Sequence, residues 1–417
     1  MNKETHITAL VNKLSVEVLL KLDKNKLSEI KDKLMAIDEE FLELVKDKIQ
    51  VIHKLINEDN NLISLVDSDE ITKQISYDFD IDFDGVSAFV PPKKYEHPSE
   101  FGIGLIVGTS GGGKTTLLNK YGSVQEYDYD NTLSIASNFE TYDEAKKAFF
   151  GVGLNSIPVW LKPYRVLSNG EKYRATLAKM LKDGAVFDEF TSIVDRPTAK
   201  SMASSIGEYI RREDFKNVVF ASPHKDIIEW LQPDWVYDLD TNEITLKENL
   251  RSRPPIRIDF KFNEKHLWGL FSKHHYISAT LNKSANVFTA YWEGVLVGIV
   301  AVLTLPSGTL KNAYRGHRTV VFPEYQGFGI GKTISDSIGQ LYVDNDRRFF
   351  AKTAHPKMGE HRQKSVCWKP TSKNRVKRKQ KEATQAKGKW VVILDKPAFS
   401  HEFLGGFDIN YLKDFTL

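Results

Sequence analysis

The sequence predicts a multidomain α/β protein, with a helical N-terminal region followed by two α/β domains. Apolar residues recur at helical spacing through residues 1–75. Residues 101–120 then give an apolar run, a glycine loop and a helix-forming stretch, and the same order returns at residues 318–343. Because 417 residues are too many for one hydrophobic core, we expect two or three domains, with boundaries at 1–75, 76–248 and 255–417.

The composition is typical of a soluble globular protein, with 41% hydrophobic and 27% charged residues. No apolar run approaches the roughly 18 residues of a membrane span, and the first residues lack the pattern of a signal peptide. We therefore expect a cytoplasmic protein without a membrane partner. The single cysteine, Cys367, excludes an intramolecular disulfide and a cysteine-based zinc cluster.

The N-terminal region predicts two or three long helices, because it combines the helical spacing with an absence of glycine and proline. The pattern changes at residues 77–83, where apolar residues alternate strictly with aspartates. Such alternation is typical of a half-buried antiparallel strand. We therefore expect a small β-layer before the next domain.

The first glycine loop follows the apolar run 101–107, which predicts a strand, and it precedes a helix. It matches the pattern G-x(4)-G-K-[ST]. Backbone amides of such a loop cradle phosphates, its lysine reaches the β- and γ-phosphates, and its hydroxyl residue binds Mg²⁺. The sequence therefore predicts an ATP site, with Mg²⁺ on Thr115, formed by Gly108, Gly111, Gly112, Gly113, Lys114, Thr115 and Thr116.

Further motifs follow in a fixed order. Ser168 and Gly170 lie in LSNGE, which leads into a helix, and an apolar strand ends at Asp188 and Glu189. Residues 192–195 come next, and a strand at 218–222 precedes His224. With the glycine loop, this order resembles the ABC ATPase family over about residues 76–248, with LSNGE in place of the family's LSGGQ.

The resemblance implies a role for each of these residues. Asp188 would hold the Mg²⁺ shell, Glu189 would polarise the attacking water and His224 would contact the γ-phosphate. Ser168 and Gly170 would face the nucleotide of a second subunit, so hydrolysis would need an ATP-dependent homodimer. The family's Q-loop glutamine has no clean counterpart, and we assign Asn138, after a strand expected at 132–137, to that metal-binding position.

A second glycine loop follows a linker expected at 240–256 and a β-hairpin at 287–305 that turns at Glu293-Gly294. In this part of the chain a predicted strand is followed by the pattern Q-x-x-G-x-G, a helix and another strand. This order resembles the coenzyme A loop of the GNAT acyltransferase family, and the resemblance covers about residues 255–417. The resemblance implies that the strand, including Val320, offers backbone groups to the pantetheine arm. The loop amides would bind the pyrophosphate of acetyl-CoA or another acyl-CoA. This loop comprises Gln326, Gly327, Phe328, Gly329, Ile330, Gly331 and Lys332.

Direct acyl transfer needs a base for the acceptor and an acid for the departing thiolate. The candidates are His355, Glu324, Tyr325 and the stretch 274–276, which contains two histidines and a tyrosine. No spacing rule selects one of them. We place His355 first because it follows the end of a predicted strand.

Basic residues are concentrated in the last part of the chain. Residues 352–389 contain thirteen Lys/Arg against two acids, which predicts contact with DNA or RNA. Trp368 and Trp390 border the densest part and are candidate stacking surfaces. The candidate phosphate contacts are Lys373, Arg375, Lys377, Arg378, Lys379 and Lys381.

The combined order resembles a group of bacterial, archaeal and phage proteins in which an ABC-type ATPase is fused to an acetyltransferase domain. The first hypothesis is an ATP-dependent acyltransferase that modifies a nucleic acid. A second is a protein or small-molecule N-acetyltransferase regulated by its ATPase. A third is a nucleic-acid-binding ATPase whose transferase domain is catalytically inactive.

Overall fold

The computed structural model describes residues 96–124, 126–275, 280–376 and 398–408, together with parts of residues 1–95 and the short strands at 385–386 and 389–390. The chain folds as two compact units, Met1–Tyr95 and Glu96–Leu417. Among the described helices, none combines the length and apolar composition that crossing a membrane requires.

The first unit contains the expected amphipathic helix. α3 (Lys24–Met35) begins at Asp23, whose side chain accepts a hydrogen bond from the Lys26 amide. Leu27 and Leu34 lie seven residues apart on α3 and are buried together with Leu19. The expectation of helices alone was wrong, because β1 (Leu62–Leu65) pairs antiparallel with β2 (Val86–Phe89).

The strand expected at residues 77–83 is also wrong. α5 (Glu70–Phe79) includes the first three of these residues, and Asp80 ends the helix in the left-handed conformation, while residues 82–83 lie outside the described residues. Asp69 and Thr72 cap each other at the start of α5, which favours a helix from its first turn. Ile71, Ile75 and Phe79 follow at intervals of four, so a helical period underlies the local alternation. The small β-layer that we expected is formed by β1 and β2.

The second unit begins with a sheet in the order β4-β5-β3-β6-β7. β3 lies at its centre, is buried at all five positions and is parallel to β5 and β6, while β7 is antiparallel to β6. The carboxyl ends of β3, β4 and β5 therefore meet at one edge. The strands are β3 (Ile103–Val107), β4 (Val186–Phe187), β5 (Val218–Ser222), β6 (Trp235–Asp238) and β7 (Glu243–Leu246).

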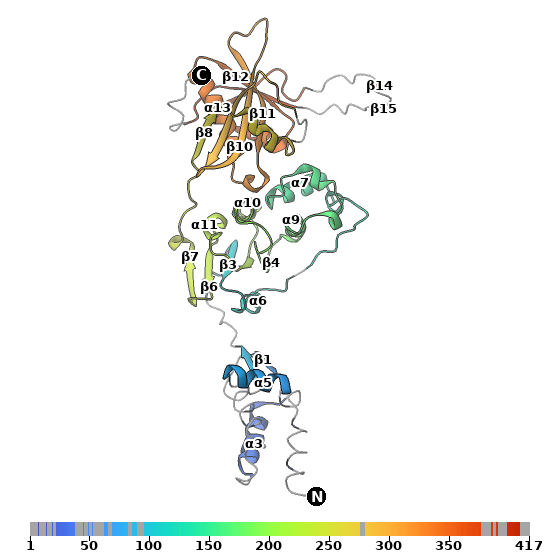
Figure 1. The fold of residues 1–417 in the computed structure, drawn as a ribbon, viewed down its shortest axis with the longest axis vertical. Coiled ribbons are helices and arrows are strands. Elements are labelled where there is room, and N and C mark those ends of the chain that lie inside the picture. Colours follow the sequence, from blue (N-terminus) through green and yellow to red (C-terminus); the bar gives the residue numbers. More distant parts are fainter. Residues whose placement is uncertain are drawn as a thin grey trace. The chain divides into compact units, whose positions relative to one another are not determined.

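Helices α6 to α11 accompany this sheet, and α9, α10 and α11 are visible near its strands in Figure 1. Their apolar residues form a continuous core with the strands, including Leu177 of α9 and Ile206 of α10. The helices are α6 (Lys114–Leu118), α7 (Tyr142–Gly151), α8 (Ile157–Trp160), α9 (Asn169–Met180), α10 (Arg196–Glu213) and α11 (Ile228–Leu231).

Two local expectations in this region fail. Residues 132–137 form a turn and the start of a 3₁₀-helix (Ala136–Asn138) instead of a strand. Asp130 accepts hydrogen bonds from the amide and hydroxyl of Thr132, and short polar side chains that bond nearby backbone compete with strand formation. The linker expected at 240–256 contains β7, which extends the sheet.

The C-terminal half of the second unit is a sheet in the order β13-β16-β12-β11-β10-β9-β8 over the described residues. α13 packs against β10, β11 and β12 (Figure 1). The expected hairpin is confirmed as β9 and β10, and both turn residues, Glu293 and Gly294, have positive φ. The strands are β8 (Ile258–Phe262), β9 (Asn286–Trp292), β10 (Val295–Thr304), β11 (Ala313–Val321), β12 (Arg348–Thr353), β13 (Trp368–Pro370) and β16 (Phe399–Phe403). The helices are α12 (Trp268–Ser272), α13 (Ile330–Asp344) and α14 (Pro356–Lys364). β14 (Gln385–Ala386) and β15 (Lys389–Trp390) form a separate pair.

β11 and β12 separate along their length. They pair only over residues 313–315 and 348–350, after which β12 continues beside β16 to Thr353. Residues 316–321 of β11 therefore have β10 on one side and no strand ladder on the side toward β12. This open edge leads directly into the second glycine loop.

Candidate nucleotide and acyl-donor sites

The first glycine loop connects β3 to α6 and encloses its lysine. Gly113 precedes α6 with φ 89°, a conformation that costs glycine little. Lys114 is buried, and its Nζ donates to the carbonyl oxygens of Gly108 at 3.0 Å and Thr109 at 2.8 Å. The ammonium group is thus positioned inside the loop. Asp240 braces the loop from outside, because Oδ1 accepts from the Thr109 amide at 2.9 Å, a bond that lowers the pKa of Asp240 to about 2.

Two oxygen ligands meet beside this loop. Thr115 Oγ1 donates to Asp188 Oδ2 at 2.6 Å, and Asp188 Oδ1 accepts from the Glu189 amide at 2.8 Å. Hydroxyl and carboxylate oxygens suit Mg²⁺, which keeps several waters and takes one or two carboxylates plus substrate phosphates. Thr115 and Asp188 therefore fit that ion. No larger cluster of His, Cys, Asp or Glu with metal-ligand geometry occurs in the described residues.

Glu189 follows Asp188 at the end of β4. Its backbone has φ 49°, which is uncommon for a residue with a side chain. The Ser192 hydroxyl donates to Glu189 Oε2, so the segment 192–195 holds this carboxylate. Its side chain is exposed at the mouth of the loop, where it can reach a water molecule.

His224 follows β5, and the sequence did not reveal what orients it. Its Nδ1 lies 3.2 Å from the hydroxyl of Thr191, which is fully buried and has φ 73°. Positive φ is an outlier for a β-branched residue and is found at constrained functional positions. Burial lowers the pKa of His224, Arg196 lowers it further, and the charges of Glu189 and Lys114 also reach the ring. His224, Glu189 and Lys114 therefore share one site.

Among the described residues, no hydrogen bond or ion pair links Ser168, Gly170 or Asn138 to this site. Ser168 caps α9 and exchanges hydrogen bonds with Glu171, and the helix expected after LSNGE is confirmed. The side chain of Asn138 bonds within its own loop. Its Oδ1 accepts from the backbone amide of Asp130 at 2.9 Å, and its Nδ2 donates to Ser134 O at 2.9 Å. The roles assigned to these three residues stay predictions.

The second glycine loop connects the open edge of β11 to α13. Gly327 and Gly329 have φ of 117° and 82°, and Gly329 precedes the helix without any side-chain cap. The first amides of a helix without such a cap are available to an anion. A Cβ on Gly329 would lie 2.9 Å from Cε of Lys332. The lysine side chain therefore covers the start of the helix.

The outer side of this loop contacts α10. Ser201 Oγ donates to the carbonyl of Gln326. A Cβ on Gly327 would lie 2.5 Å from Ser205 Oγ and 2.7 Å from Ser201 Oγ, so only glycine fits there. Phe328 packs edge-on against Trp230 of α11, with ring centroids 4.7 Å apart. The helix that follows residues 192–195 of the first site therefore supports the second loop.

The candidate bases lie in two places. His355 directly precedes α14, its ring lies 5.7 Å from that of Phe150 in α7, and burial lowers its pKa to about 4. Glu324 lies within electrostatic range of His274 and Tyr325. His355 thus lies beside α7, whereas Glu324 lies with His274 and Tyr325. Residues 276–279, with Tyr276, lie outside the described residues.

The basic stretch is described only in part. Lys373 and Arg375 are exposed, while Lys377, Arg378, Lys379 and Lys381 lie outside the described residues. The proposed stacking role of Trp368 is wrong, because its side chain is 4% exposed and its indole donates to Asp336 Oδ1 at 2.9 Å.

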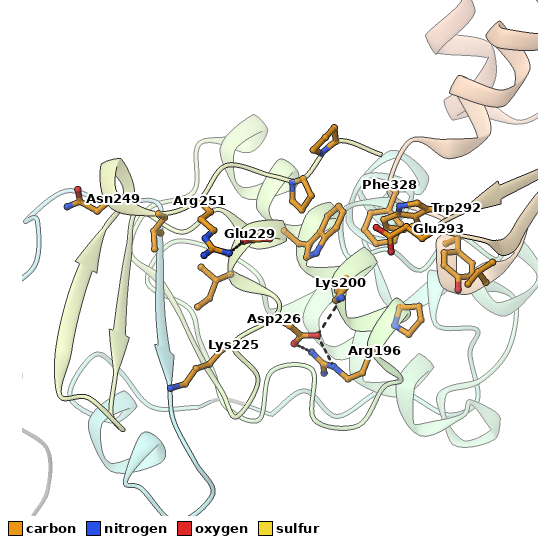
Figure 2. A pocket seen from close by; sticks show the side chains of 18 residues that line it. Arg196, Lys200, Lys225, Asp226, Glu229, Asn249, Arg251, Trp292, Glu293 and Phe328 are labelled. Atoms are coloured by element: carbon orange, nitrogen blue, oxygen red, sulfur yellow. Dashed lines mark hydrogen bonds and ion pairs between the residues drawn. The ribbon is translucent and has the colours of Figure 1, made fainter. Parts of the chain in front are cut away.

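A groove of about 700 Å³ lies where the glycine loop of the second site meets α10 and α11. Figure 2 shows Arg196 and Lys200 directed at Asp226, and Phe328 beside Trp292. Arg251 pairs with Glu229 at 3.8 Å, and Lys225 pairs with Asp238 at 2.7 Å. The groove is therefore aromatic, and each of these cations already has a carboxylate.

Parts of the chain are similar to solved structures. The IAA acetyltransferase from Bacillus cereus is 14% identical with a TM-score of 0.25, over 35% of this chain and 99% of that one. A Bacillus subtilis acetyltransferase in complex with CoA is 14% identical with a TM-score of 0.26, over 36% and 98%. The dimeric structure of a bacterial ABC transporter cassette is 15% identical with a TM-score of 0.28, over 36% and 87%. Such identities are too low to transfer an activity.

No protein-family model matches the chain, and no curated protein is similar to it.

Proposed function

We propose that the chain binds and hydrolyses ATP at the first glycine loop. The observation that carries this proposal is the convergence of Lys114, the Thr115–Asp188 pair, Glu189 and His224 at one edge of the sheet. Lys114 and the loop amides would hold the phosphates, and Thr115 and Asp188 would hold Mg²⁺, which neutralises phosphate charge. Glu189 would orient the attacking water and accept its proton, and His224 would contact the γ-phosphate.

We also propose acyl transfer from a coenzyme A thioester at the second loop. The uncapped start of α13 suits a diphosphate, and the open edge of β11, including Val320, suits the amide-containing arm of the donor. The acceptor's amine or hydroxyl would attack the thioester carbonyl, the C–S bond would break, and the thiolate would leave with the proton that the acceptor loses. Glu324 and His274 are the candidate proton carriers beside this loop, and His355 remains a candidate.

The contacts of α10 support a coupling between the two activities. α10 begins at Asp195, directly after the residues that hold Glu189, and its Ser201 and Ser205 touch the loop at Gln326 and Gly327. A shift of α10 during the ATP cycle would move the loop that holds the acyl donor. ATP would in this way regulate the transferase.

The proposal includes an ATP-dependent homodimer in which Ser168 and Gly170 complete the partner's nucleotide site. Ser168 is exposed, as such a role requires. We propose a nucleic acid as the acceptor, because the transferase half carries the basic stretch 352–389. Mass analysis of nucleosides from cells that express the protein tests this acceptor, and an acylated protein or small amine would favour the second hypothesis.

Calorimetry on the full chain tests the two binding sites separately. Lys114→Ala should lose ATP binding and keep acetyl-CoA binding, because its ammonium group lies inside the first loop. Gly329→Trp should do the reverse, since φ 82° and the nearby Lys332 leave no room for an indole. Lys182→Ala and Gly308→Trp are matched controls at exposed positions and should bind both ligands. A parent protein that binds no acetyl-CoA would contradict the transferase and leave the ATPase proposal intact.

A further inference from the structure

β11 contains a β-bulge that the sequence pattern does not reveal. Its partner β10 pairs Ala301 with Arg318 and the next residue, Val302, with Gly316, so His317 is the extra residue. Bulges re-aim side chains and occur next to active sites. The bulge lies on the part of β11 that has no β12 ladder.

The bulge places two arginines on one face of the sheet. Arg315 pairs with Leu303 and Arg318 with Ala301, and directly opposite residues share a face. Leu303 and Ala301 both belong to the apolar cluster beneath α12. In a regular strand, residues three apart would lie on opposite faces. The bulge therefore brings Arg315 and Arg318 together.

Neither arginine has a carboxylate partner among the described ion pairs. Arg318 donates to the carbonyls of His317 at 2.9 Å and Thr280 at 3.3 Å, while its buried Nε has no hydrogen-bond partner. Burial and the charge of Arg315 lower the pKa of Arg318. Because no carboxylate lies between them, the two positive guanidinium groups repel each other. An anion bound between them would remove this repulsion.

The histidine at the bulge, His317, also indicates an anion site at the two arginines. His317 Nε2 accepts from the Asn282 amide at 3.4 Å, so the ring is neutral at that nitrogen. Burial, Arg318, Arg315 and His275 all lower its pKa, to about 4. The groove of Figure 2 differs, because its cations are already paired with Asp226, Glu229 and Asp238. The bulge is therefore the better anion site.

We propose that Arg315 and Arg318 bind a backbone phosphate of the acyl acceptor, and that this acceptor is a strand of nucleic acid. The proposal rests on the acyl transfer proposed above, because a donor whose diphosphate lies on residues 326–331 and whose arm follows the open edge ends at the bulge. β13, which carries Lys369, lies in the same sheet three strands from β11. A strand of nucleic acid can reach both, whereas a lone phosphate cannot.

The test uses the full chain and a fluorescent single-stranded oligonucleotide, titrated by anisotropy at several salt concentrations. Arg315→Gln/Arg318→Gln should bind about tenfold more weakly than the parent. The slope of log affinity against log salt should become shallower by roughly 0.7, the value for one lost phosphate contact on a single strand. Arg257→Gln/Lys311→Gln removes the same charge at two exposed positions and should retain the parent slope.

Acetyl-CoA and ATP titrations on the same samples show whether each variant is folded. If the double variant binds neither acetyl-CoA nor ATP, the single variant Arg315→Glu replaces it in the oligonucleotide titration. Position 315 is exposed and tolerates substitution, and a glutamate there repels phosphate. A double variant with the slope of the parent overturns the proposal, as does a parent that binds no oligonucleotide. A mononucleotide that binds as tightly as the oligonucleotide also overturns it, in favour of a small acceptor. If the parent protein binds no acetyl-CoA, the proposed acyl transfer is contradicted, whatever the oligonucleotide titration shows.

Discussion

The two glycine loops of the second unit differ in where their stability comes from. The loop before α6 is organised from within, because Lys114 binds its carbonyls and Thr115 reaches Asp188 on the neighbouring β4. In the loop before α13, Gly329 provides no side-chain cap for the helix, and α10 holds the loop from outside through the hydrogen bond of Ser201 to Gln326. The first loop thus depends on its own sheet, whereas the second depends on the other half of the unit.

This difference separates two kinds of chemistry. A loop with its own cation and carboxylate is prepared for phosphate and Mg²⁺ before any ligand arrives. A loop propped by a helix from the nucleotide-binding half can change its geometry when that helix moves. The first loop is therefore the expected driver of the cycle, and the second is the expected responder.

The largest expected effect comes from Glu189→Gln, which removes the carboxylate that we propose orients the attacking water at the first loop. ATP hydrolysis should fall at least about 10²-fold, because proton transfer by a positioned base contributes that much. ATP binding should persist, since the contacts of Lys114 and Thr115 are intact. A steady-state phosphate-release assay measures the first effect and calorimetry the second.

Sedimentation with ATP should show the Glu189→Gln protein accumulating as a dimer. Glu126→Gln, at an exposed position of the same half, is the control and should hydrolyse ATP at the parent rate. Hydrolysis at the parent rate by Glu189→Gln would remove Glu189 from the mechanism.

A smaller effect should follow from Gly327→Ala, which tests the support that α10 gives to the second loop. The new Cβ would meet Ser205 and Ser201 of α10, and φ 117° is itself strained for alanine. Acetyl-CoA affinity should fall about tenfold, the equivalent of one such strained residue. Calorimetry in the Glu189→Gln background, with and without ATP, measures it.

The control for this substitution is Gly294→Ala in the turn between β9 and β10. Gly294 has φ 80° and open space around its Cα, so alanine adds backbone strain without touching α10. It should leave acetyl-CoA affinity unchanged. Ser201→Ala removes the hydrogen bond to Gln326 without strain, and it should reduce the difference that ATP makes to acetyl-CoA affinity. An undiminished difference would show that α10 does not couple the sites.

The sequence predicted the first loop well because its determinants are local. Lys114 and its carbonyl partners lie within seven residues, and Ser168 and Glu171 specify the start of α9 by a capping pattern. The hairpin of β9 and β10 was equally clear from Glu293-Gly294. Local signals also misled, since alternation at 77–83 concealed the helical period of α5.

The second loop's surroundings could not be predicted in the same way. Ser201 and Gln326 are 125 residues apart, and nothing near either residue indicates their contact. Arg315 and Arg318 lie on the same face of β11 only because of a bulge, which breaks the period of two that a strand pattern assumes. The role of Thr191 in orienting His224 could be identified only from its positive φ and its contact with the His224 ring in the structure.

The last prediction concerns stability on the acid side of the pH range, where the two halves of the unit meet at His355. Its ring packs beside Phe150 of α7, and burial, with Lys357 nearby, lowers its pKa to about 4. The unfolded chain binds a proton near pH 6.5, whereas the folded chain does not until about pH 4. The stability that depends on neutral His355 is thus fully present above pH 6.5 and is lost progressively toward pH 4, by at most about 3 kcal/mol. Urea midpoints at pH 7.5 and 4.5 should therefore converge in His355→Gln relative to the parent. An unchanged difference between the two midpoints would show that His355 does not link the halves through its charge.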